Sequence, residues 1–191
     1  MRRTMAKKWF QALTLTLALT AVSAPHPVLA GEKPRESRNV ELQLAPGDTI
    51  KVTTYGLPAL SGDFVISSEG TIAFPLVGNI KAAGVKPSAI QETITAGLAS
   101  GYVTEPSVAV EVGSYRPIYI LGEVGKPGEY PYSLGLTIRD AVAKAGGFTY
   151  RANEKRVYIK GAGEDDEHPY KLTAGIPVAP GDTIRIGERY F

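Results

Sequence analysis

Residues that could carry catalysis or bind a metal are few in this chain. The sequence contains two histidines and no cysteine. His26 falls in an N-terminal segment that we predict to be removed, which leaves His168 as the single imidazole. One imidazole and no thiol argue against Ser-His-Asp, Cys-His and multi-histidine zinc sites.

Acidic residues offer two further candidates. His168 follows the run Glu164-Asp165-Asp166-Glu167, whose oxygens could hold a hard cation, but a solvated hairpin tip is the favoured interpretation. Asp48 and Asp182 each follow a Pro-Gly pair, and glycoside cleavage requires two carboxylates. An Asp at this place instead favours a structural role, because it accepts hydrogen bonds from nearby backbone N–H groups. We therefore predict no catalytic residue and no metal site.

Two other patterns are weighed in the same way. The spacing Gly122-x-x-Gly125-x-x-Gly128 resembles a phosphate-binding loop, but Pro127 and a following strand stand where the phosphate-binding helix would begin. We interpret it as a turn and predict no cofactor.

The ten tyrosines are well suited to contact with a sugar polymer, since a phenol offers a flat apolar face and a hydroxyl. Tyr102, Tyr115, Tyr130, Tyr132 and Tyr150 fall in predicted loops or element ends, where a lumen or subunit contact could use them. Ordinary strand packing explains Tyr119 and Tyr158 equally well, and we name no tyrosine as a site.

The first thirty residues have the layout of a secretory signal peptide. A basic head at residues 1–8 precedes an apolar stretch at residues 12–22 and a small-residue exit. The apolar stretch is shorter than the roughly 20 residues that cross a bilayer. Of the two possible exits, Ala24 and Ala30, we favour Ala30, because Pro25 would hinder cleavage after Ala24. The prediction is export to the periplasm, removal of residues 1–30 and no lipid-modified N-terminus.

Removing this segment changes the charge of the protein. The whole chain carries a net charge of +2, and the segment holds four basic residues and no acid, so residues 31–191 carry −2. A slightly acidic chain without a run of Lys and Arg lacks the electrostatic footprint of a nucleic-acid-binding protein. Without cysteine, its stability must come from burial, and its length allows two small domains.

Residues 31–39 are polar and unpatterned, which predicts a mobile leader, with order from Val40. A first domain at residues 40–114 is predicted from four patterns. Residues 44–52 predict a Pro-Gly-Asp turn and a strand, and residues 64–66 and 71–74 predict a hairpin. Residues 87–100 predict a helix with a capping box of Ser88 and Gln91 and a face of Ile90, Ile94 and Leu98. Residues 107–112 predict a last strand.

The second domain is predicted at residues 115–191. It begins with a strand at 117–121 and a turn at 125–128. A short helix follows, capped by Thr137 and stopped by Gly146-Gly147, with Ile138, Ala141, Val142 and Ala145 on one face. Strands are predicted at 156–160, 170–172 and 183–186, and residues 178–186 repeat the turn-plus-strand pattern of residues 44–52. The expected fold class is α+β.

Six phrases in this order resemble the outer-membrane polysaccharide export family. Its periplasmic part joins a polysaccharide-export domain to a soluble-ligand-binding β-grasp (SLBB) domain. In the first domain the phrases are LAPGDTIKV at 44–52, GTIAFPLVG at 70–78 and EPSVAV at 105–110. In the second they are ILGEV with PGEY within 120–130, TIRDAVAKAGG at 137–147 and PGDTI at 180–184. The resemblance implies a small polysaccharide-export domain of β-sheet and helix, followed by one β-grasp domain.

The resemblance also implies partners. It implies a ring-shaped homo-oligomer that forms a periplasmic passage for polysaccharide, coupled to an inner-membrane co-polymerase that carries or recruits a tyrosine kinase. The chain departs from the family pattern because it lacks a lipid-accepting cysteine and stops at Phe191 after the second domain. A separate outer-membrane β-barrel is therefore expected to supply the opening.

The functional prediction is a non-enzymatic component of capsular or extracellular polysaccharide export, in the periplasm and associated with the outer membrane. The alternative is a monomeric periplasmic ligand-binding module without a conduit role. Native mass separates them, because a conduit needs a closed ring. A periplasmic enzyme acting on sugar polymers is a third possibility, to which the sequence gives little support.

Overall fold

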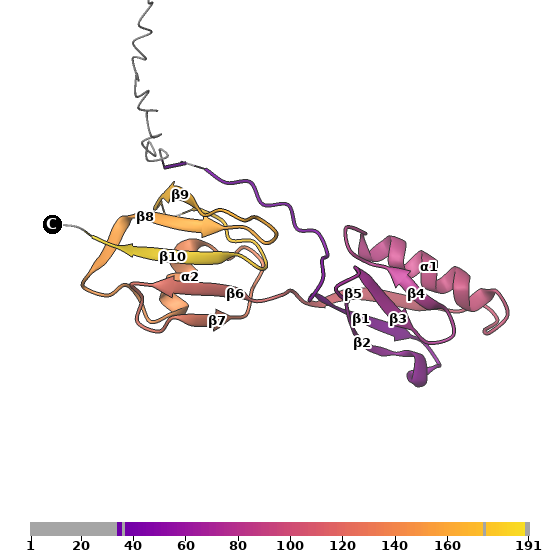
Figure 1. The fold of residues 1–191 in the computed structure, drawn as a ribbon. Coiled ribbons are helices and arrows are strands. Elements are labelled where there is room, and N and C mark those ends of the chain that lie inside the picture. Colours follow the sequence, from indigo (N-terminus) through magenta and orange to yellow (C-terminus); the bar gives the residue numbers. More distant parts are fainter. Residues whose placement is uncertain (1–33, 36, 174, 190–191) are drawn as a thin grey trace, which may run out of the picture. The chain divides into compact units, whose positions relative to one another are not determined.

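The computed structural model describes residues 34–35, 37–173 and 175–189. The predicted signal peptide lies outside the described residues. Figure 1 shows the order of the elements along the chain. The first group is β1 (Thr49–Thr54), the 3-10 helix η1 (Pro58–Leu60), β2 (Gly62–Val65), β3 (Thr71–Phe74), β4 (Gly78–Lys81), α1 (Pro87–Ala99) and β5 (Val108–Ser114). The second group is β6 (Ile118–Gly122), β7 (Gly128–Tyr130), α2 (Ile138–Lys144), β8 (Ala152–Lys160), β9 (His168–Lys171) and β10 (Thr183–Glu188).

The first group forms an antiparallel sheet of order β2-β1-β5 and a separate hairpin of β3 and β4. Alternation places Ile50 and Val52 of β1 inward, where they meet the buried stripe of α1. That stripe consists of Ile90, Ile94 and Leu98, as the spacing predicts. The strand and the helix therefore each bury an apolar side in one core, to which β3, β4 and β5 also contribute.

The predicted hairpin at residues 64–66 and 71–74 is wrong in its pairing. The turn between them exists: Gly70 adopts φ 77°, and its N–H donates to the carbonyl of Ser67. The flanking strands, however, pair elsewhere, β2 with β1 and β3 with β4. The N–H of Ile66 donates to the carbonyl of Asp48, which holds the end of β2 on the first sheet. Strand β4 was not predicted, because alternation is hard to recognise in a strand of four residues.

The predicted capping box of α1 is also wrong. Lys86 occupies the N-cap position and makes no side-chain cap hydrogen bond, while Pro87 begins the helix and Ser88 lies inside it. Proline is well suited to a first helical position, since it has no N–H to leave unsatisfied there. Proline rather than a capping side chain thus marks the start of this helix.

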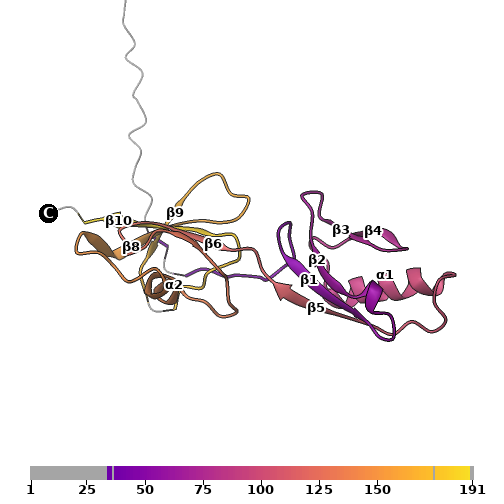
Figure 2. The same ribbon diagram turned by 90° about the horizontal axis from the view of Figure 1, so that it is seen from below.

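The second group forms one mixed sheet of order β7-β6-β10-β8-β9. Strand β10 lies parallel to β6, and the other pairs are antiparallel. Helix α2 covers one face of this sheet (Figure 2). Thr137 caps the helix as predicted: its hydroxyl accepts from the N–H of Asp140, and the Asp140 carboxylate accepts from the N–H of Thr137. The chain is an α+β protein with a separate apolar core in each group.

The leader makes contacts earlier in the chain than expected. Arg35 lies beside β9, where its N–H donates to the carbonyl of Pro169 and its carbonyl accepts from the N–H of Lys171, both at 2.8 Å. An added strand of this kind covers backbone groups at the edge of a sheet. Ordered contacts thus begin before Val40.

No helix within the described residues is long and apolar enough to cross a membrane.

The two helix starts allow a matched test of capping. Thr137→Ala should lower the free energy of unfolding by about 1 kcal/mol, because it removes the hydroxyl that accepts from the N–H of Asp140 and donates to the Asp140 carboxylate. Ser88→Ala should change it by less than about 0.5 kcal/mol, because Ser88 is exposed within the helix and caps nothing. Urea titration of the two variants measures both values. A larger loss for Ser88→Ala than for Thr137→Ala would contradict the assignment.

Candidate functional site

Each Pro-Gly-Asp turn holds its aspartate in the same way. Asp48 and Asp182 are both completely buried. The Asp48 carboxylate accepts from the N–H of Ala45 at 2.8 Å, and the Asp182 carboxylate accepts from the N–H of Ala179 at 2.7 Å. The repeated sequence therefore builds a repeated turn, closed by a side chain that bonds three residues back.

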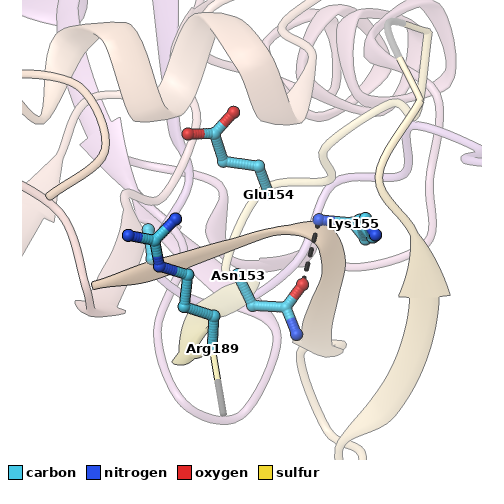
Figure 3. A pocket seen from close by; sticks show the side chains of 5 residues that line it. Asn153, Glu154, Lys155 and Arg189 are labelled. Carbon is cyan, nitrogen blue, oxygen red and sulfur yellow. Dashed lines mark hydrogen bonds between the residues drawn. The ribbon is translucent and has the colours of Figure 1, made fainter. Parts of the chain in front are cut away.

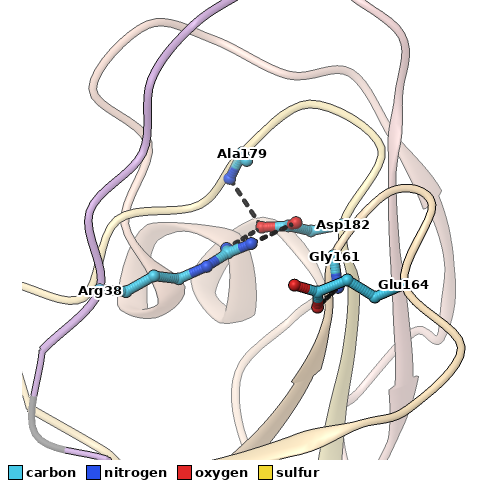
Figure 4. A network of polar contacts seen from close by, with 5 residues as sticks. All are labelled: Arg38, Gly161, Glu164, Ala179 and Asp182. Carbon is cyan, nitrogen blue, oxygen red and sulfur yellow. Dashed lines mark hydrogen bonds and ion pairs between the residues drawn. The ribbon is translucent and has the colours of Figure 1, made fainter.

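Each buried carboxylate also meets an arginine from a distant part of the chain. Asp48 accepts from the backbone N–H of Arg116 at 2.7 Å and from the Nη1 of Arg116 at 3.0 and 3.2 Å. Asp182 accepts two guanidinium hydrogen bonds from Arg38 of the leader, one of them from Nη2 at 2.8 Å (Figure 4). A bidentate arginine supplies both the charge and the donors that a buried carboxylate needs.

The electrostatics of Arg38 follow from this pairing. Burial disfavours its charge, but the hydrogen bond and the charge of Asp182 outweigh burial and raise the pKa of the guanidinium. The Arg38 guanidinium therefore stays charged at physiological pH.

Arg116 connects the two turns. Its side chain reaches Asp48 of the first turn while passing close to Gly181 of the second. A Cβ atom at Gly181 would lie 2.8 Å from the Nε of Arg116, and Gly181 also adopts φ 80°. Glycine is required there both for its backbone conformation and for the approach of the arginine.

A hollow of about 210 Å³ adjoins this ion pair. Arg38, Arg116 and Asp182 line it together with Glu164, whose carboxylate accepts from the N–H of Gly161 at 2.8 Å (Figure 4). The side chains of Arg38, Arg116, Asp182 and Glu164 already take part in hydrogen bonds within the protein.

The two aspartates do not form a glycosidase pair. Both carboxylates are buried and engaged by backbone N–H groups and arginine. Glycoside cleavage needs one carboxyl group that protonates the leaving oxygen and another that faces the sugar ring. Neither group can reach a substrate in this structure.

The acidic run and His168 are similarly occupied. Glu167 accepts from the guanidinium of Arg185, and the ring Nδ1 of His168 lies 3.1 Å from the Nη2 of Arg35. Asp165 and Asp166 are exposed. Within the ranges that the structure describes, no group of three or more His, Asp or Glu side chains is arranged to hold a metal.

The glycine-rich stretch after β6 is a close-packed turn. Gly122 adopts φ 84°, and a Cβ atom there would lie 2.0 Å from the carbonyl oxygen of Ile186. A Cβ at Gly125 would lie 2.8 Å from the carbonyl oxygen of Gly146. These glycines permit backbone contact between segments and leave no space for a phosphate.

The tyrosines divide into packed and open groups. Tyr115 and Tyr132 pack edge to face at 5.5 Å between ring centroids, and the Tyr130 hydroxyl donates to the carbonyl of Lys126. Burial and the neighbouring Tyr115 raise the pKa of Tyr132. Tyr102 and Tyr150 are exposed, as expected for loop residues. Tyr119 is exposed too, because it lies on the uncovered face of its strand.

Another hollow, with a volume of about 440 Å³, lies beside the start of β8. Asn153, Glu154, Lys155 and Arg189 line it (Figure 3). The Asn153 side-chain oxygen accepts from the N–H of Lys155 at 3.0 Å. The lining is polar and has no aromatic ring, so it offers hydrogen bonds but no flat apolar surface for a sugar.

Two parts of the chain match known protein families. Residues 36–113 match the family described as polysaccharide biosynthesis/export protein, and residues 117–167 match the SLBB domain. Together these ranges include β1 to β5 and most of the second sheet.

Curated relatives carry related names. The chain is 35% identical over 130 residues to the exopolysaccharide production protein ExoF of Rhizobium meliloti. This alignment covers 65% of this chain and 31% of ExoF. It is 32% identical over 155 residues to the EPS I polysaccharide export outer membrane protein EpsA of Ralstonia nicotianae, covering 75% of this chain and 40% of EpsA. It is 30% identical over 111 residues to the polysialic acid transport protein KpsD of Escherichia coli, covering 57% of this chain and 20% of KpsD. The chain thus spans two fifths or less of each of these relatives.

The buried ion pairs give a test of stability. Asp182→Ala should lower the free energy of unfolding by about 2–5 kcal/mol, because it leaves Arg38 charged, largely buried and unpaired. Glu188→Ala breaks the exposed pair with Arg151 and should cost less than about 1 kcal/mol. Urea denaturation of both variants, with Arg38→Ala and the double variant to complete the cycle, measures the coupling. Equal effects of the buried and the exposed pair would refute this assignment.

Proposed function

The chain belongs to the polysaccharide biosynthesis/export family, and on this basis we propose that it acts in the export of capsular or extracellular polysaccharide. The observation that carries the proposal is the succession of two family matches, the export family over the first sheet and core and the SLBB domain over β6, β7, α2 and β8 of the second. The names of the relatives support the same role, since all three refer to production, export or transport of a polysaccharide.

The proposed role is non-enzymatic. The carboxylates that invited a catalytic interpretation are buried in ion pairs. A component that passes a long hydrated polymer should bind it weakly, because each tight contact would slow the next step. Exposed tyrosines and polar hollows are suited to weak contact with sugars.

The proposed place of action is the periplasm, at the outer membrane. Residues 1–30 would direct secretion, with cleavage after Ala30. We propose that copies of the chain assemble into a ring around a passage and that an inner-membrane co-polymerase, with its tyrosine kinase, delivers the polymer. The free energy for movement would come from polymer synthesis, because the chain has no nucleotide-binding motif.

Deleting the gene tests the export role. Secreted polysaccharide should disappear while lipid-linked repeat units are still made inside the cell, because synthesis precedes export. Extracellular sugar and lipid-linked intermediates are measured in the same cultures, and complementation with the wild-type gene is the control. Unchanged secretion, in a strain without a paralogue, would contradict the proposal.

Native mass of the purified chain tests the ring. We expect a single large closed oligomer, because a passage needs several subunits around its axis. Native mass spectrometry and light scattering give the subunit number. A monomer at all concentrations, alone and with the co-polymerase, would instead favour the periplasmic ligand-binding module.

A further inference from the structure

One face of the second sheet is open. The buried side chains of β6, β8 and β10, among them Ile120, Ile159 and Ile184, form one core with the buried side chains of α2. Residues of the same strands at alternating positions point the other way. We call this opposite side the outer face, and it consists of Tyr119, Leu121, Arg156, Tyr158, Lys160 and Arg185.

Strand pairing fixes the layout of the outer face. Tyr119 and Lys160 lie on either side of Thr183 on the central strand β10. Leu121 and Tyr158 lie on either side of Arg185 in the next row. Tyr119 and Leu121 are 41% and 43% exposed. Since neighbouring strands are about 4.8 Å apart, the backbones at Tyr119 and Lys160 are separated by roughly 10 Å.

Arg185 and Tyr158 form a stacked cation–π pair in the middle of this face. The Arg185 guanidinium lies 4.1 Å from the centroid of the Tyr158 ring, and Glu167 accepts from its Nε at 2.8 Å. The hydrogen bond that Arg185 donates to Glu167 raises the pKa of the guanidinium, although partial burial acts in the opposite direction. A stacked and hydrogen-bonded pair loses little freedom when a ligand lies on it.

The remaining cations of the outer face are available. Within the described part of the chain, Lys160 and Arg156 make no ion pair. Both are partly exposed and point to the same side as Tyr158. Glu129 lies opposite Tyr119 on the edge strand β7, so the positive part of the face lies over β8 and β10. The outer face therefore joins apolar rings on one side to positive charge on the other.

We propose that the outer face binds a segment of an anionic polysaccharide, with Tyr119 packing against a sugar ring and Lys160 and Arg156 pairing with its carboxylates. This inference rests on the proposed export function and names the chemical class of the polymer. Charge complementarity selects this occupant. A second copy meeting the face symmetrically would bring like charges together, which is unfavourable.

Binding by the full purified chain tests the proposal. The probe is an end-labelled alginate oligosaccharide, a polyuronate, and the control ligand is a neutral dextran oligosaccharide of the same length. Fluorescence anisotropy should report weak binding of alginate that declines with added salt, and little binding of dextran. Tyr119→Ala and Lys160→Gln should each weaken alginate binding about threefold to tenfold. Tyr102→Ala, in the first domain, and Lys144→Gln, on α2, should leave it unchanged.

Several outcomes would overturn the proposal. These are equal binding of alginate and dextran, no alginate binding, or binding that Tyr119→Ala and Lys160→Gln do not weaken. Self-association that these two substitutions abolish, without alginate binding, would identify the outer face as a contact between copies instead. Circular dichroism of each variant confirms that it folds.

Complementation of the deletion strain separates the two proposals. If the deletion stops secretion and the Tyr119→Ala, Lys160→Gln double variant restores it fully, the outer-face proposal fails and the export role stands. If the deletion leaves secretion unchanged, the export role itself fails. Reduced secretion with the double variant, and full secretion with the Tyr102→Ala, Lys144→Gln control, is the expected result.

Discussion

A buried carboxylate must be paired, and this requirement organises the chain. The Pro-Gly-Asp turn places Asp48 and Asp182 where water cannot reach them, and one backbone N–H from within the turn satisfies only part of each carboxylate. A buried charge without a counter-charge is costly, so an arginine must complete each site. Neither arginine lies in a helix or strand: Arg38 precedes β1, and Arg116 lies between β5 and β6.

The two pairs cross over between the halves of the chain. Arg38 precedes the first domain and binds the turn of the second, while Arg116 immediately precedes β6 and binds the turn of the first. The segments that contain Arg38 and Arg116 are thus held in place by ion pairs. The same arrangement explains why the leader forms backbone hydrogen bonds with β9, since Arg35 lies three residues before Arg38. The polar groups most like an active site are therefore used to hold the protein together.

With the carboxylates committed to structure, the open surfaces carry what remains for function. The second sheet covers one face with α2 and leaves tyrosines and cations on the other. A flat surface of this kind suits an extended, hydrated partner better than an enclosed pocket would, because it can be occupied at many positions along a polymer. A transport role in the polysaccharide export family is consistent with such a surface, and catalysis is not required of it.

The sequence by itself determined the elements with strong periodicity, and tertiary structure decided which of them meet. The spacing of Ile90, Ile94 and Leu98 predicts α1, and Thr137 with Asp140 indicates the start of α2. Each of these patterns lies within a few residues of the chain. Strand pairing is not local: residues 64–65 join β1 although an adjacent turn predicted a hairpin with β3. The structural role of Asp48 and Asp182 could be expected from Pro-Gly-Asp, but their arginines could not, since 68 and 144 residues separate the partners. The outer face could not be predicted from the sequence for the same reason. Alternation shows that a strand has two sides, and only packing decides which side stays exposed.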